Sequence, residues 1–179
     1  DFAIPDSAFM VLLLKLLKGI TITKFSGYDF LRKFFVETNI KKGDLFLVDP
    51  TEGEASINNE YLNKIGIPID IEYHYVAPIY GKDEINDQML LNVLNNLDQK
   101  PKYIMINLGS NVQEPLGYYI KQNLNYKSGI FGTGAAIAFF TGSQAPISPI
   151  VDRLGLGWLW RCIGEPTKYF PRYFKALNL

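Results

Sequence analysis

Short apolar segments that alternate with helical segments are the feature that most constrains the fold of this chain. Buried strands are expected at residues 44–48, 69–75, 103–108 and 129–131, with helices between them at residues 54–64, 83–97 and 113–122. Strands separated by helices of this kind are typical of a parallel sheet that is covered by helices on both faces. The sequence therefore predicts an α/β, Rossmann-like core.

Two further helices are expected before the first strand. Pro5, Asp6 and Ser7 are helix-start residues, and they precede an apolar run that ends at Gly19, so we expect a buried helix of about three turns there. Residues 28–37 are predicted to form the second helix. The apolar run is shorter than the roughly 20 residues that a membrane-spanning helix needs, and it is not predicted to cross a bilayer.

The composition changes from Pro146 onward. No further strand is predicted there, and residues 147–179 hold five basic against two acidic residues together with many aromatic ones. The sequence thus predicts an α/β core over residues 1–146 and a helical, aromatic and basic C-terminal appendage over residues 147–179. Two interpretations of the aromatic residues stay open, because they suit either an ordinary core or a membrane surface.

The overall charge and the rarest residues exclude several classes of protein. The 18 basic residues equal the 18 acidic ones, so the charge gives no reason to expect a nucleic-acid partner. The single cysteine, Cys162, cannot form an internal disulfide, which favours a reducing cytoplasm. The single histidine, His74, has no second histidine or cysteine near it in sequence, and no Asp-x-Asp pair is present, so neither a metal site nor a cofactor is expected.

Small-residue turns follow three of the predicted strands, where open parallel sheets bind their ligands. The first turn begins at Gly109 and leads to Gln113 and Glu114, and it could present backbone N–H groups and an amide to a phosphate or a sugar. The second comprises Gly132, Thr133 and Gly134, where chain atoms can approach a ligand closely. The third is residues 49–53.

Each candidate has a structural alternative. Glycine-rich turns also serve as tight corners, Glu114 could complement the dipole of a helix start, and Asp6 could cap its helix. A histidine in a strand, as predicted for His74, is more often structural than a ligand. These alternatives stay open at this point.

Several strings of residues are similar to strings of one known family. Ile106-Asn107-Leu108-Gly109-Ser110-Asn111-Val112-Gln113-Glu114 resembles V-G-L-G-x-P-x-Q-E, and Gly132-Thr133-Gly134-Ala135 through Thr141-Gly142 and Ala145-Pro146 resembles G-V-G-x-x-F-D-x-x-x-G…A-P. Leu154-Gly155-Leu156-Gly157-Trp158-Leu159-Trp160-Arg161, with Glu165-Pro166 and Arg172-Tyr173, is similar to L-G-L-E-W-L-Y-R…E-P-x-R…R-Y. Pro5-Asp6-Ser7 and Phe25-Ser26-Gly27-Tyr28-Asp29 resemble the upstream elements P-D-G and x-x-G-x-D. On these strings the chain resembles the WecG/TagA/CpsF glycosyltransferases, a family of bacterial enzymes.

The chain also departs from the family strings at several positions. Ser7, Asn111 and Gly157 replace a glycine, a proline and a glutamate, Ala138 replaces an aspartate, and Asp49-Pro50 replaces a Gly-Gly turn. These departures bear on the identity of the donor sugar and on activity itself.

The resemblance implies an inverting, metal-independent transfer of a sugar, N-acetylmannosamine or a relative, from a UDP-sugar to an undecaprenyl-diphosphate-linked acceptor. It places Asp6 at the position of the general base and Gln113 at the donor, and Arg161 or Arg172 would supply cations for the departing UDP. It further implies a cytoplasmic protein attached to the inner face of the membrane, and it leaves open whether the chain forms a homo-oligomer. Two other hypotheses remain at this stage: a nucleotide-sugar-binding protein without transferase activity, and a scaffolding subunit of a polysaccharide assembly.

Overall fold

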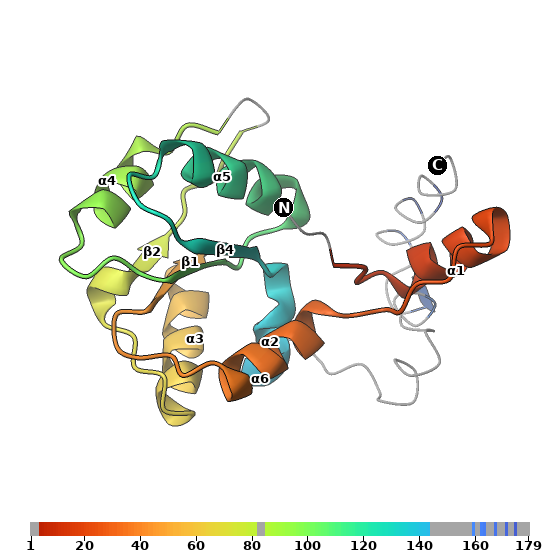
Figure 1. The fold of residues 1–179 in the computed structure, drawn as a ribbon, viewed down its shortest axis with the longest axis horizontal. Helices are drawn as coiled ribbons and strands as arrows, with labels where there is room; N and C mark the ends of the chain where they lie inside the picture. Colours follow the sequence, from red (N-terminus) through yellow and green to blue (C-terminus); the bar gives the residue numbers. More distant parts are fainter. Residues whose placement is uncertain are drawn as a thin grey trace. The chain divides into compact units, whose positions relative to one another are not determined.

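The computed structural model describes residues 4–81 and 85–143, together with residues 159, 162, 163, 167, 171 and 174. The chain divides into two units, one formed by Asp1–Phe30 with Ala145–Leu179 and the other by Leu31–Gln144 (Figure 1). The expected boundary between a core over residues 1–146 and an appendage over residues 147–179 stays a prediction, because most of the appendage lies outside the described residues.

A four-stranded parallel sheet forms the centre of the unit Leu31–Gln144. Its strands are β1 (Leu45–Asp49), β2 (His74–Val76), β3 (Tyr103–Ile106) and β4 (Gly129–Gly132), in the order β2-β1-β3-β4. All three strand pairs are parallel. The predicted α/β, Rossmann-like class is confirmed.

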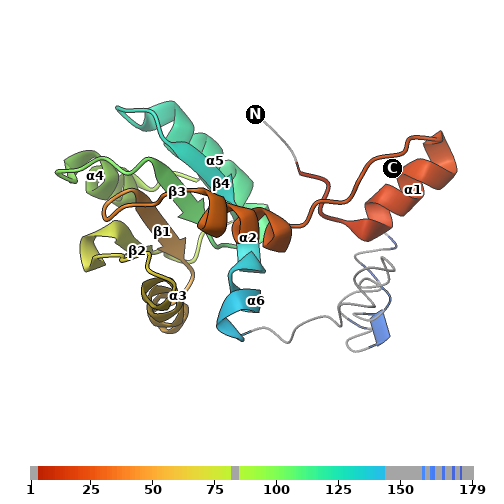
Figure 2. The ribbon, with the colours of Figure 1, turned by 60° about the horizontal axis from the view of Figure 1, so that its bottom comes forward.

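Helices cover both faces of this sheet. They are α3 (Glu52–Lys64), α4 (Gln88–Asn96), α5 (Ser110–Asn123) and α6 (Ala138–Thr141), with α2 (Gly27–Glu37) beginning in the other unit and two short 3₁₀ turns, η1 (Ile71–Tyr73) and η2 (Gly134–Ala136). Figure 1 shows α4 and α5 on one face of the sheet and α3 and α6 on the other, and Figure 2 shows the same layers from a second direction. The sheet is therefore the middle of three layers.

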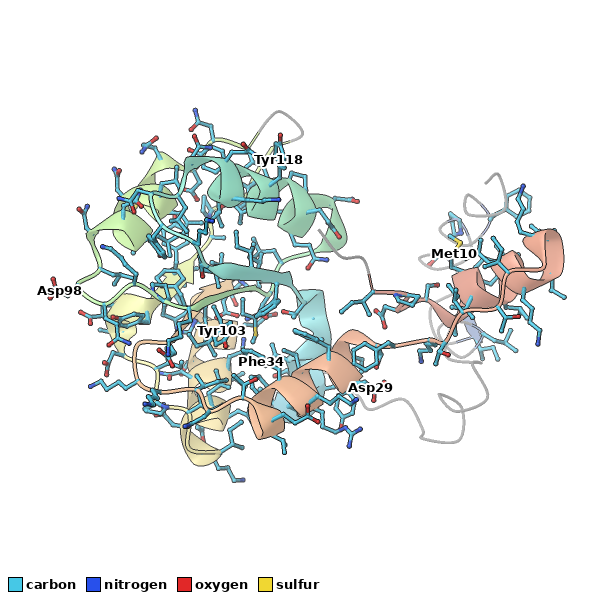
Figure 3. The ribbon with its side chains drawn as sticks, in the orientation of Figure 1. Met10, Asp29, Phe34, Asp98, Tyr103 and Tyr118 are labelled. Atoms are coloured by element: carbon cyan, nitrogen blue, oxygen red, sulfur yellow. The ribbon has the colours of Figure 1, made fainter. Side chains whose placement is uncertain are left out.

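The core is built on β1, in which all five residues are buried. An aromatic cluster covers one face of the sheet: the ring of Phe34 on α2 lies edge-on, 5.0 Å from the ring of Tyr103 and 5.3 Å from that of Phe131 (Figure 3). Aromatic pairs of this geometry add roughly 0.5–1.5 kcal/mol each beyond the area that they bury. This cluster ties the end of α2 to β3 and β4.

Helix α1 (Ala8–Lys18) begins and ends where the sequence predicts, since Ser7 is its N-cap and Gly19 ends it with a φ of 67°. The Ser7 Oγ accepts a hydrogen bond from the Met10 N–H at 3.2 Å. The expectation that this helix is buried is wrong, because none of its eleven residues is buried and Leu16 is 70% exposed. Within the described residues, no helix is long and apolar enough to cross a bilayer.

Two predicted elements are shorter than expected, each for a local reason. The segment 69–75 contains only the first two residues of β2, because the Tyr73 N–H bonds back to the Asp70 carbonyl at 2.9 Å and closes the 3₁₀ turn η1. Helix α4 begins at Gln88 rather than near residue 83, because Asp87 is its N-cap and accepts from the Leu90 N–H at 2.9 Å.

Candidate functional site

The carboxyl ends of β1, β3 and β4 meet at one edge of the sheet, and backbone hydrogen bonds tie the residues that follow them. The Asn107 N–H donates to the Val48 carbonyl at 2.9 Å, and the Thr133 N–H donates to the Ile106 carbonyl at 3.1 Å. The three turns that the sequence singles out therefore leave neighbouring strands at the same edge, where α/β sheets bind ligands.

Helix α5 starts at this edge without a side-chain cap. Gly109 is its N-cap, with φ −63° and ψ 154°, and it has no side chain that could accept a hydrogen bond. The Val112 and Gln113 N–H groups both donate to the Gly109 carbonyl, at 2.9 and 3.0 Å. The N–H groups ahead of Val112 precede the first hydrogen bond of the helix, and they could donate to an acceptor group such as a phosphate oxygen. The structural alternative for Glu114 is wrong: α5 begins at Ser110, so the exposed Glu114 lies beyond the first turn and does not complement the helix start.

The side chain of Gln113 lies against the turn that follows β4. A Cβ placed on Gly132 would be 3.2 Å from the Gln113 Cδ, and one placed on Gly134 would be 3.5 Å from the Gln113 Oε1. Gly134 also has a φ of +53°, a conformation that favours glycine. Both glycines thus allow Gln113 to approach the turn closely, and the structure brings the two candidate turns together.

One polar atom of Gln113 is left unpaired. Its Nε2 donates to the Glu114 Oε1 at 3.0 Å, whereas its Oε1 is buried and accepts no hydrogen bond from the described residues. A buried acceptor without a partner costs roughly 1–3 kcal/mol, so this unpaired oxygen is a candidate contact for a ligand that brings a hydrogen-bond donor.

Five polar side chains form a connected group beneath this edge, which we call the Asp49 network: Asp49, Asn58, His74, Asn107 and Thr133. The Asp49 Oδ1 accepts from the Asn58 Nδ2 at 2.7 Å and from the Asn107 Nδ2 at 2.8 Å, and the Asp49 Oδ2 contacts the His74 Nε2. The Thr133 hydroxyl donates to the Asn107 Oδ1 at 3.0 Å. The network joins all four strands and α3.

Sequence reasoning missed most of this network. The turn at Asp49 was a candidate for ligand contact, yet the Asp49 carboxylate is fully buried and occupied by protein partners. Asn107 was hidden inside the predicted strand 103–108, although an amide directly after a buried strand is a signal that could have marked it. His74 is structural, as the sequence favoured, because it is the partner of Asp49.

A second polar cluster holds the segment between β2 and α4. The hydroxyls of Tyr75 and Tyr80 donate to the Asp87 Oδ2 at 3.0 and 2.6 Å, while the Asp87 Oδ1 caps α4. Burial and the neighbouring Asp87 carboxylate raise the pKa of Tyr75 to about 12, and the pKa of Tyr80 is raised by the same causes. The two hydroxyls and the Asp87 carboxylate are hydrogen-bonded to one another and to the start of α4, so we interpret this cluster as structural.

Of the three predicted catalytic residues, Asp6 is the one that lies within the described part of the chain. Asp6 is exposed and belongs to the unit of α1, where Ser7 and not Asp6 caps the helix, so the capping interpretation of Asp6 is wrong. Arg161 and Arg172 lie outside the described residues. In the part of the chain that the structure describes, no three His, Cys, Asp or Glu side chains gather as metal ligands would.

The four parallel strands with helices on both faces define an α/β protein of the Rossmann-like class, in which the carboxyl edge of the sheet is the candidate site. The chain belongs to the WecG/TagA/CpsF family of glycosyl transferases, whose family model matches residues 1–179, the whole chain. It is accordingly a glycosyltransferase of polysaccharide biosynthesis. A comparison with curated proteins gives no match.

Proposed function

We propose that this glycosyltransferase carries out an inverting, metal-independent transfer of a sugar, N-acetylmannosamine or a relative, from a UDP-sugar to an undecaprenyl-diphosphate-linked acceptor. The observation that carries the donor part is the buried, unpaired Gln113 Oε1 beside Gly132 and Gly134. The acceptor and the stereochemistry follow from the family resemblance.

The donor is proposed to bind across the start of α5 and the turn after β4. The diphosphate would accept hydrogen bonds from backbone N–H groups that follow Gly109, where the positive end of the helix dipole favours negative charge. A hydroxyl or N–H of the donor would satisfy the Gln113 Oε1, with Thr133 and Glu114 at the borders of the same edge. The proposal thus pairs the start of α5 and the Gln113 Oε1 with groups that a UDP-sugar has.

Asp6 is proposed as the general base. The acceptor hydroxyl oxygen attacks the anomeric carbon of the donor sugar, and the bond between that carbon and the UDP oxygen breaks. The bonding electron pair leaves with UDP, and the hydroxyl proton passes to the Asp6 carboxylate. Ser7 rather than Asp6 caps α1, so the exposed Asp6 carboxylate does not cap the helix and could accept a proton from the acceptor. The negative charge on the departing UDP would be met by backbone N–H groups and by Arg161 and Arg172.

The basic and aromatic residues 147–179 are proposed to attach the protein to the inner face of the cell membrane, where the lipid-linked acceptor lies. Their net charge of plus three would give roughly 3 kcal/mol of attraction to anionic lipid, which is enough for reversible binding only. The enzyme is thus proposed to be cytoplasmic and peripherally bound to the membrane, and the active form could be a monomer or a homo-oligomer.

The test is to incubate the protein with a panel of UDP-sugars and a short lipid-diphosphate acceptor analogue, and to look for a glycosylated product. We expect product with one donor, and we expect Gln113→Ala to raise the KM for that donor without lowering the melting temperature appreciably. Donor binding without product from any member of the panel would favour a binding protein, and absence of any nucleotide binding would favour a scaffolding subunit. Either outcome would overturn the proposal.

A further inference from the structure

The Asp49 network is unusual because it buries a carboxylate completely at the edge where the ligand is proposed to bind. The Asp49 side chain is 0% exposed and that of His74 is 6% exposed, so neither can contact a ligand directly. A buried charge is tolerated only where hydrogen-bond partners surround it, and both Asp49 oxygens have such partners. A fully satisfied buried network of this kind fixes the orientation of its members.

The orientation of the Asn107 amide is fixed from both ends. Its Nδ2 donates to Asp49, so its Oδ1 is turned toward Thr133 and accepts the Thr133 hydroxyl at 3.0 Å. A rotation of the amide by half a turn would place its NH₂ against the Thr133 hydroxyl and its oxygen against the Asp49 carboxylate. Asp49 therefore determines which group of Asn107 meets Thr133.

Thr133 lies between the two glycines that touch Gln113. Its backbone is held by the N–H bond to the Ile106 carbonyl at 3.1 Å, and its side chain is held by Asn107. A displacement of Thr133 would move Gly132 and Gly134, whose positions set the space around the Gln113 Oε1. The network thus connects a buried carboxylate to the proposed donor site through two side chains.

We propose that Asp49 is a positioning residue of the donor site, acting through Asn107 and Thr133 to hold the turn 132–134 against Gln113. This inference rests on the proposed donor site for its effect on kinetics, but its structural part does not depend on the transferase activity.

The test compares Asp49→Ala with Asp49→Asn. The asparagine keeps an oxygen for Asn58 and Asn107 and can offer its NH₂ to the His74 Nε2, whereas the alanine leaves all three groups unpaired. Hydrogen exchange followed by mass spectrometry should show that Asp49→Ala speeds exchange in residues 132–136 by about tenfold, the factor expected on loss of one hydrogen bond, and changes β3 less. Asp49→Asn should stay near the wild type.

With a donor that is turned over, Asp49→Ala should raise the donor KM by about tenfold with little change in kcat, because the turn contacts the donor in the ground state and the transition state alike. A purely structural role would lower the active fraction and leave KM unchanged. Equal effects of the alanine and asparagine variants, or uniform acceleration of exchange across the sheet, would overturn the proposal.

Thr133→Val is the second variant, for the case that Asp49→Ala fails to fold. It removes the hydroxyl that lies 3.0 Å from the Asn107 Oδ1 and, less closely, 3.4 Å from the Ile106 carbonyl oxygen, and Thr133→Ser is the matched control that keeps this hydroxyl. We expect faster exchange in residues 132–136 for the valine variant alone, and identical exchange in both variants would refute the connection. If no UDP-sugar is turned over at all, the exchange measurements still decide the positioning role, while the proposed function fails by itself.

Discussion

The close contact between Gly132 and Gln113 can be tested by adding a single methyl group. In Gly132→Ala the new Cβ would lie 3.2 Å from the Gln113 Cδ and 3.3 Å from its Cγ and Oε1, so Gln113 has to shift by a few tenths of an ångström. Because the contacted atoms belong to a flexible side chain, we expect the free energy of unfolding to change by less than about 1 kcal/mol. A misplacement of 1 Å can cost roughly a hundredfold in rate, so a shift of this size should lower kcat/KM for the donor by roughly three- to tenfold.

Gly117→Ala is the matched control on α5. Its Cβ would be 3.5 Å from the Ile130 Cγ2 and 3.6 Å from the Ile106 Cδ1, which are ordinary contacts. Alanine is favoured over glycine inside a helix by about 1 kcal/mol, so the melting temperature should rise by about 2–4 °C with unchanged kinetics. Donor kinetics and thermal melts of the two variants check both statements. If Gly132→Ala transfers sugar at the wild-type rate, Gln113 does not bind the donor as argued.

Three further predictions concern the base, a buried tyrosine and the C-terminal segment. Asp6→Asn should lower transfer by about a hundredfold or more while UDP binding, measured by calorimetry, stays nearly intact, and activity within about tenfold of the wild type would remove the base assignment. Burial raises the pKa of Tyr75 from 10.0 to about 12, so its contribution to stability is fully present below about pH 10 and is lost between pH 10 and 12; melting temperatures across that range should fall less steeply for Tyr75→Phe than for the wild type. Removal of residues 147–179 should abolish sedimentation with anionic vesicles, whereas Arg161→Ala and Arg172→Ala should keep the fold and lose rate; a shortened chain that transfers sugar at full rate would contradict the cationic roles.

The alternation of apolar strands and helices was sufficient to predict the parallel sheet, because burial on both faces leaves the strands as nearly continuous apolar runs. Helix ends were predictable where a cap residue is adjacent in sequence, as at Ser7 and Gly19. The start of α4 was placed too early because two possible cap residues, Asp83 and Asp87, precede its apolar run. The hydroxyls of Tyr75 and Tyr80 that hold Asp87 in place come from other parts of the chain and leave no periodic signal. The exposure of α1 was missed because its sequence is apolar on most of its surface.

Part of the candidate site could likewise be predicted from the sequence, and part of it could not. Turns that follow parallel strands share an edge of the sheet by topology, so candidate residues could be named from the order of the strands. The approach of Gln113 to Gly132 and Gly134 was not predicted, because it depends on how side chains pack at that edge. The Asp49 network could not be predicted, because the hydrogen bond from Asn107 to Asp49 spans 58 positions and depends on the register of β1 with β3. Single-sequence patterns contain no information on which polar groups are paired across strands.

The central claim is a metal-independent, inverting transfer from a UDP-sugar. The most direct measurement is to let the wild-type protein act on its best UDP-sugar and the acceptor analogue in the presence of excess EDTA, and to determine by NMR the anomeric configuration of the new glycosidic bond. The account predicts a product whose configuration is opposite to that of the donor, formed at the same rate with and without EDTA. A product that retains the configuration of the donor, or transfer that requires an added divalent cation, would contradict it.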